Sequence, residues 1–95
     1  MNLEKSKKRI AKRVKMGFQG YPQISISYVG ASTSRAEEVL VKLMMEEGAE
    51  PMTESFKSKL DVREDEVIQS ALVKMIERSE AKTVNVFENI ELKSS

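Results

Sequence analysis

Residues 24–29 read Ile24-Ser25-Ile26-Ser27-Tyr28-Val29, which alternates large apolar side chains with smaller, mostly polar ones. Successive side chains of a β-strand point to opposite faces of the sheet, so this stretch predicts a strand with one buried face and one polar face. A sheet made of such strands needs helices on one side only. The stretch therefore predicts a two-layer domain in which the second face of the sheet is open.

The remaining sequence divides into segments whose apolar residues recur at a helical or a strand period. This pattern predicts helices at 3–16, 34–47 and 63–79, and strands at 23–29, 52–62 and 83–92. A short helix at 52–58 is the rival interpretation of the segment 52–62. In the last strand, Glu88 interrupts the apolar face, and this predicts a bulge or tight turn at Glu88-Asn89.

The helix at 34–47 is predicted from its start, its stripe and its end. Ser34 and Glu37 have the spacing of a capping box, in which two side chains satisfy the free backbone donors of a helix N-terminus. Gly48 is a typical helix stop. The apolar stripe between them consists of Ala36, Val39, Leu40, Leu43 and Met44.

These elements describe a single small domain of the α/β or α+β class that spans residues 1–95. Their order is α-β-α-β-α-β, and strands joined through helices tend to be parallel. The expected sheet has about three strands in the order 1-2-3. The helices cover one face, and the other face is polar and carries Phe87, Lys57 and Lys59.

The composition argues against several classes of function. The chain contains neither cysteine nor histidine, so thiolate chemistry, the commonest general base and the commonest metal ligand are all missing. The acidic residues show no metal-ligand spacing, and no nucleophile–base pair is recognisable. We therefore expect no enzyme, no metal and no cofactor. No segment has the length and apolarity of a membrane span, so cytoplasmic residence is the expected location.

The charge is strongly divided along the chain. Residues 1–16 hold seven basic residues and one acidic residue, whereas the remainder holds 9 basic and 14 acidic residues. A basic helix on an acidic body points to an anionic partner, and nucleic acid is the leading candidate. The candidate contact residues are Lys5, Lys8, Arg9, Lys12, Arg13, Lys15, Lys57 and Lys59.

A competing interpretation is that this helix is an ordinary solvated element. Leu3, Ile10 and Val14 form an apolar stripe that can dock it on the body, where its charge would neutralise nearby acids. Binding to an anionic membrane is less favoured, because the stripe lacks Trp, Phe and a broad leucine face. Whether the helix docks or projects decides how many of its cations are available.

Two further candidate sites depend on the helix predicted at 34–47. The turn before it carries Ser32, Thr33, Ser34 and Arg35, which could hold a small anion at a helix N-terminus. Val41 and Met45 lie outside the main stripe of that helix and could form an interface in a homodimer. The sequence thus predicts a non-enzymatic binding or assembly domain. The alternatives to nucleic-acid binding are a protein-interaction module and a small-anion binder.

Overall fold

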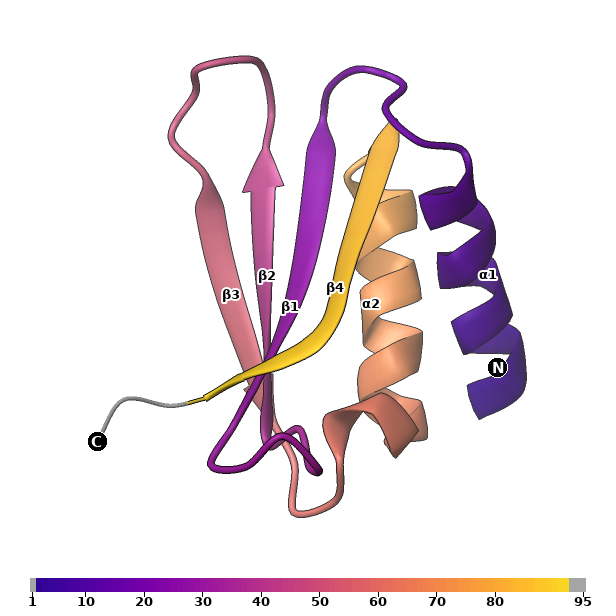
Figure 1. The fold of residues 1–95 in the computed structure, drawn as a ribbon. Helices are drawn as coiled ribbons and strands as arrows, with labels where there is room; N and C mark the ends of the chain where they lie inside the picture. Colours follow the sequence, from indigo (N-terminus) through magenta and orange to yellow (C-terminus); the bar gives the residue numbers. More distant parts are fainter. Residues whose placement is uncertain (1, 93–95) are drawn as a thin grey trace.

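The computed structural model describes residues 2–92, which form two α-helices, one 3-10 turn and one four-stranded sheet (Figure 1). The elements, in chain order, are α1 (Leu3–Lys15), β1 (Gln23–Gly30), β2 (Glu38–Met44), β3 (Met52–Lys57), the 3-10 turn η1 (Val62–Glu64), α2 (Glu66–Arg78) and β4 (Thr83–Leu92).

The sheet has the strand order β3-β2-β1-β4. β1, β2 and β3 form an antiparallel meander, and β4 returns parallel to β1 after α2. The predicted order α-β-α-β-α-β, with about three parallel strands, is therefore wrong. The molecule is a small mixed α+β domain with one helix-flanked sheet, in which α1 and α2 lie side by side near β4 (Figure 1).

The largest difference from the sequence-based prediction is the segment 34–47, which contains strand β2 instead of a helix. Val39 and Val41 are buried, whereas the intervening Leu40 is half-buried and Lys42 is exposed, so the segment alternates as a strand does. Its apolar residues fit both periods. The strand is the state that lets β2 pair with β1 on one side and with β3 on the other.

The features taken for a helix start serve the connection between β1 and β2. The Glu37 carboxylate accepts a hydrogen bond from the backbone N–H of Ala31 at 3.1 Å, and the Ser34 hydroxyl lies 3.0 Å from that of Ser32. The backbone N–H of Glu37 donates to the carbonyl of Val29. The polar groups of the expected capping box therefore stabilise a loop between antiparallel strands.

Three of the other elements have the expected boundaries, whereas the strand predicted at 52–62 ends five residues early. α1, β1 and β4 agree with the predicted segments to within one residue, while β3 ends at Lys57 and α2 begins only at Glu66. The Asp65 carboxylate caps α2 by accepting from the backbone N–H of Val67 and Ile68. The bulge at Glu88-Asn89 is confirmed, since the partner of β1 jumps from Phe87 to Ile90 at this point.

The core lies between the two helices and one face of the sheet. The large side chains that β1 buries are those of Ile24, Ile26 and Tyr28, as its alternation predicts. They belong to one apolar cluster that also includes Ile10 of α1 and Leu72 of α2. Both helices therefore cover the same face, and the serines of β1 lie on the other.

Strand pairing brings polar side chains together on this open face. Ser25 lies beside Lys42 and Asn85, and Ser27 lies beside Leu40 and Phe87. Phe87 is 54% exposed. The open face is thus mainly polar, as predicted. It also carries the half-buried Leu40, which lies on β2, the segment predicted as a helix.

Candidate nucleic-acid interface

The basic helix α1 docks on the body of the protein. The Asn2 side chain caps it by accepting from the backbone N–H of Lys5 at 2.9 Å. Ile10 is 6% exposed and joins the core, and the buried Ser6 hydroxyl lies 3.2 Å from the Ser70 hydroxyl on α2. The helix also packs against β4. Its orientation is consequently set, and each of its basic residues has a definite direction.

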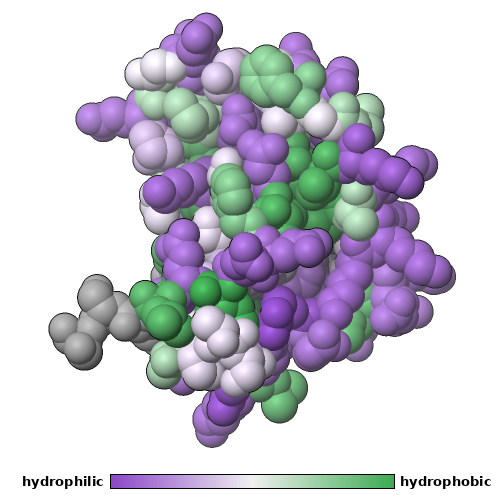
Figure 2. All heavy atoms as spheres, in the orientation of Figure 1, coloured by the Kyte–Doolittle hydropathy of each residue, from purple (hydrophilic) through white to green (hydrophobic). Residues whose placement is uncertain are grey.

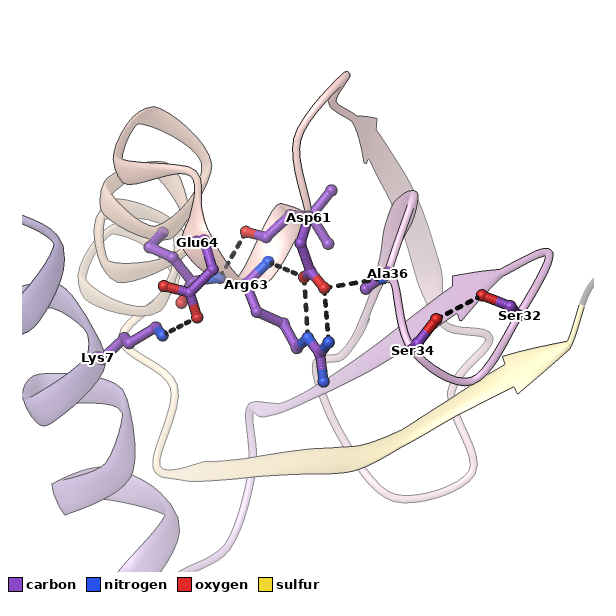
Figure 3. Close-up of polar contacts among 9 residues, drawn as sticks. Lys7, Ser32, Ser34, Ala36, Asp61, Arg63 and Glu64 are labelled. Atoms are coloured by element: carbon purple, nitrogen blue, oxygen red, sulfur yellow. Dashed lines mark hydrogen bonds and ion pairs between the residues drawn. The ribbon is translucent and has the colours of Figure 1, made fainter.

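Three of these basic residues interact with the body. Lys7 forms a 2.7 Å ion pair with Glu64, shown in Figure 3, and Arg9 forms a 3.2 Å ion pair with Glu77. The Arg13 guanidinium donates to the carbonyl of Ala81. Each contact joins α1 to residues from Glu64 to Ala81, so these cations help to hold the helix in place. Arg9 and Arg13, both predicted contact residues, are therefore engaged at least in part within the protein.

Four other lysines, Lys5, Lys8, Lys12 and Lys15, are exposed and form a row along α1, here called the lysine row. Their spacing of three, four and three residues confines them to about 80° of the helix circumference. The buried Ile10 lies on the opposite side of the helix. Within residues 2–92, none of the four forms an ion pair. Figure 2 shows that the side of the molecule occupied by α1 is mainly hydrophilic.

The structure does not bring the other two predicted lysines into this row. Lys57 lies at the end of β3, and its Nζ is 3.6 Å from the Glu38 carboxylate. β3 and β4 are opposite edges of the sheet, and α1 packs beside β4. Lys59 follows β3 in the chain. The candidate interface on α1 is therefore restricted to the lysine row and excludes Lys57 and Lys59.

The turn predicted to bind an anion has a different setting from the one expected. These residues, Ser32, Thr33, Ser34 and Arg35, connect two antiparallel strands and do not begin a helix. The Arg35 guanidinium donates to the carbonyl of Lys59. The hydroxyls of Ser32 and Ser34 pair with each other (Figure 3). The expectation of a helix N-terminus at this turn is wrong, and its support for anion binding is removed.

The loop before β2 is held in place by the carboxylate of Asp61. Asp61 accepts hydrogen bonds from the Arg63 guanidinium at 2.8 and 2.5 Å and from the backbone N–H of Ala36 at 3.1 Å (Figure 3). The Arg63 guanidinium has the largest effect in holding the pKa of the Asp61 carboxyl well below its usual range. The backbone N–H groups of Ala36 and Arg63 lower this pKa further. This network is a structural fastening between η1 and β2.

The predicted interface pair Val41 and Met45 is not a shared surface. Val41 is 2% exposed because it points into the core from β2, whereas Met45 is 50% exposed just beyond the end of that strand. The prediction assumed a helix in which the two residues lie one turn apart. On a strand they are four positions apart, and only Met45 reaches solvent.

A cavity of about 350 Å³ opens between α1 and the sheet. It is lined by Lys7, Ile10, Ala11, Val14, Tyr28, Arg63, Gln69, Val86 and Glu88. Burial raises the pKa of Tyr28, so its phenol is neutral at physiological pH. Lys7 and Arg63 are already paired with carboxylates. The two cations of the cavity lining are thus already engaged within the protein.

Two aromatic residues that follow the lysine row in the chain were not among the sequence-predicted candidates. Phe18 and Tyr21 lie in the connection between α1 and β1, with ring centroids 5.6 Å apart in an edge-to-face arrangement. Phe18 is 65% exposed. The available signal was two aromatics inside a glycine-containing stretch, Gly17 to Pro22, where a simple connection needs none.

Within residues 2–92, no helix combines the length and apolarity needed to cross a bilayer, and no three acidic residues converge as a metal site would require. No protein-family model, curated protein or solved structure matches the chain.

Proposed function

We propose that this protein is a non-enzymatic domain that binds nucleic acid through the phosphate backbone, using the lysine row of α1. The observation that carries the proposal is the position of the row, opposite the docking face and without an ion pair among the described residues. Lysines that neutralise phosphates release condensed counterions, and this release supplies most of the affinity of sequence-independent binding.

The chemistry of α1 favours phosphates over bases as its target. The most geometrically selective base contacts are the paired hydrogen bonds that Arg makes to guanine and that Asn or Gln makes to adenine. The helix contains no Asn or Gln, its single hydroxyl residue Ser6 is buried, and Arg9 and Arg13 contact the body. Lys5 and Lys15 lie ten residues apart, so the row extends about 15 Å along the helix. It therefore matches a series of phosphates and carries little sequence information.

The test compares two variants with the same change in charge. In the first, Lys5, Lys8, Lys12 and Lys15 are each replaced by Gln. In the second, the matched control, Lys42, Lys57, Lys59 and Lys74 are replaced by Gln. Gel retardation of RNA and DNA at low salt should show affinity more than about tenfold lower for the first variant.

The control variant should bind nearly as well as the unchanged protein. Equal losses in the two variants would show that overall charge, and not the row, is responsible. A lack of retardation by the unchanged protein at low salt would refute nucleic-acid binding altogether. Circular dichroism of both variants verifies that α1 and the sheet are intact.

A further inference from the structure

The connection between α1 and β1 exposes apolar side chains at the C-terminal end of the lysine row. Met16 is 53% exposed and Phe18 is 65% exposed, and Tyr21 packs edge-to-face on the Phe18 ring at an interplanar angle of 76°. Leaving a ring of this size in water forgoes about 2 kcal/mol of burial energy. Packing within the chain does not account for the exposure of Phe18.

The exposure is not the result of a loosely held loop. The backbone N–H of Gln19 donates to the Thr83 hydroxyl at 2.8 Å, and that hydroxyl donates to the carbonyl of Gly20 at 2.7 Å. Thr83 is buried at the start of β4. The backbone N–H of Lys82 donates to the carbonyl of Pro22 at 2.8 Å. These bonds fix the loop to the sheet and hold Phe18 in its outward position.

Two glycines allow the chain to follow this path. Gly17 and Gly20 have φ values of 71° and 108°, which L-residues with a side chain rarely adopt. The first ends α1 directly after the lysine row, and the second lies where the Thr83 hydroxyl anchors the loop. The aromatic pair is thus preorganised, so a ligand that stacks on it incurs little ordering cost.

Positive charge flanks the aromatic pair. Lys15, the last member of the lysine row, precedes Phe18 by three residues, and Lys82 passes close to Gly20. Exposed rings next to a line of cations are the combination that single-strand-binding proteins use, because bases stack on the rings while the phosphates follow the charges. In a duplex the base faces are already covered by neighbouring base pairs.

We propose that Phe18, supported by Tyr21, is a base-stacking element, and that the nucleic acid bound by the lysine row is single-stranded. This inference rests on the function proposed above and specifies its substrate class. One or two bases stack on the aromatic pair. The phosphates of the neighbouring nucleotides in the same nucleic-acid strand then lie along the row from Lys15 towards Lys5.

The experiment uses the absence of tryptophan from the chain. In a Phe18→Trp variant the new indole is the sole tryptophan, and its fluorescence should be quenched when a base stacks on it. The probe is a thymidine oligonucleotide of about 12 nucleotides, within the ~4–16 nucleotides that one small single-strand-binding domain covers. A duplex of the same length, titrated in parallel, should bind more weakly and quench less.

A second arm removes the ring. Phe18→Ala should weaken binding of the single strand by about 5- to 150-fold, the range for stacking one base on an aromatic side chain, and should leave duplex binding unchanged. Phe87→Ala is the matched control, because Phe87 is also about half exposed but lies on the open face of the sheet. Its effect should be less than about twofold, within the scatter expected for surface substitutions.

The outcomes separate this inference from the proposed function. Equal affinity for single strand and duplex, with no loss in Phe18→Ala but a loss in the lysine-row variant, would overturn the stacking role and leave phosphate binding intact. No binding of either form would overturn both. If the Phe18→Trp fluorescence shifts to the blue with phosphatidylserine–phosphatidylcholine vesicles and does not respond to the oligonucleotide, the partner is a lipid surface and the inference is wrong.

Discussion

At the scale of single residues, the Asp61 carboxylate joins two separate parts of the chain. Its carboxylate bonds the Arg63 guanidinium, the backbone N–H of Arg63 and the backbone N–H of Ala36. It thereby joins η1 to the residue that leads into β2. Neighbouring Asp65 has a similar role, because it caps α2 and accepts from the Ser58 hydroxyl at 2.7 Å. Both carboxyls are bound as anions.

These contacts predict a loss of stability in acid. The Arg63 guanidinium lowers the pKa of Asp61, and the Ser58 hydroxyl lowers the pKa of Asp65. In the unfolded chain, the pKa of each of these two carboxyls returns to about 3.9. The unfolded state then binds more protons, so their contribution to stability is complete above about pH 5 and disappears as the pH falls through the acid range.

Replacing Asp61→Asn should lower the free energy of unfolding by about 1.5–3 kcal/mol at neutral pH, since charge-assisted hydrogen bonds are lost. The difference from the unchanged protein should shrink as the pH approaches about 2.5. Urea denaturation across this pH range measures both effects, with Glu47→Gln, an exposed carboxyl on the β2–β3 connection, as the control. A pH-independent difference would contradict the assignment.

At the scale of elements, β2 shows how pairing overrides local pattern. Apolar residues of the segment recur at three- and four-residue intervals that suit a helix, yet Val39, Val41 and Leu43 also alternate with Glu38, Leu40 and Lys42. Both interpretations satisfy the sequence equally well. The strand conformation is selected because β2 pairs with β1 along one edge and with β3 along the other. These pairings satisfy the backbone donors and acceptors along the paired edges of all three strands.

This difference has a direct consequence for mutations. Val41→Ala should destabilise the protein by about 1.5–3 kcal/mol, because the side chain is buried in the core. Met45→Ala should change stability by less than about 0.5 kcal/mol, as expected at an exposed position. Thermal or urea unfolding of the two variants provides the comparison. Equal effects would indicate that the two residues share an environment, as they would on the helix first expected.

At the scale of the whole molecule, the division of charge acquires a direction. Glu64 and Glu77 of the acidic body form ion pairs with Lys7 and Arg9 of α1. The lysine row lies on the side of the helix opposite its buried face. The body repels polyanions while the row attracts them. Nucleic acid should therefore approach the protein from the side of α1.

The number of available lysines predicts the salt dependence of binding. Four phosphate contacts give a slope of about −2.8 for the logarithm of the association constant of a single strand against the logarithm of salt concentration. Replacing Lys8 and Lys12 by Gln should reduce this slope by about 1.4. Fluorescence titrations at several salt concentrations give the slope. A value unaffected by this double replacement would exclude these lysines as phosphate contacts.

The sequence by itself determined those features that depend on neighbours along the chain. The alternation from Ile24 to Val29 indicated a one-sided sheet, and Glu88 within an apolar face indicated a bulge. α1 and α2 followed from stripes at helical spacing. Local periodicity is sufficient for such elements, because only one backbone conformation places all their apolar side chains on one side.

Only the tertiary structure decided the state of β2, the strand order and the residues available for binding. Whether a lysine is free depends on where distant acids lie: Lys7 meets Glu64 across 57 positions and Arg9 meets Glu77 across 68. The outward position of Phe18 depends likewise on Thr83, which begins strand β4 and hydrogen-bonds the loop that carries Phe18. The partners of these groups lie far away in the chain, and no local pattern encodes their positions.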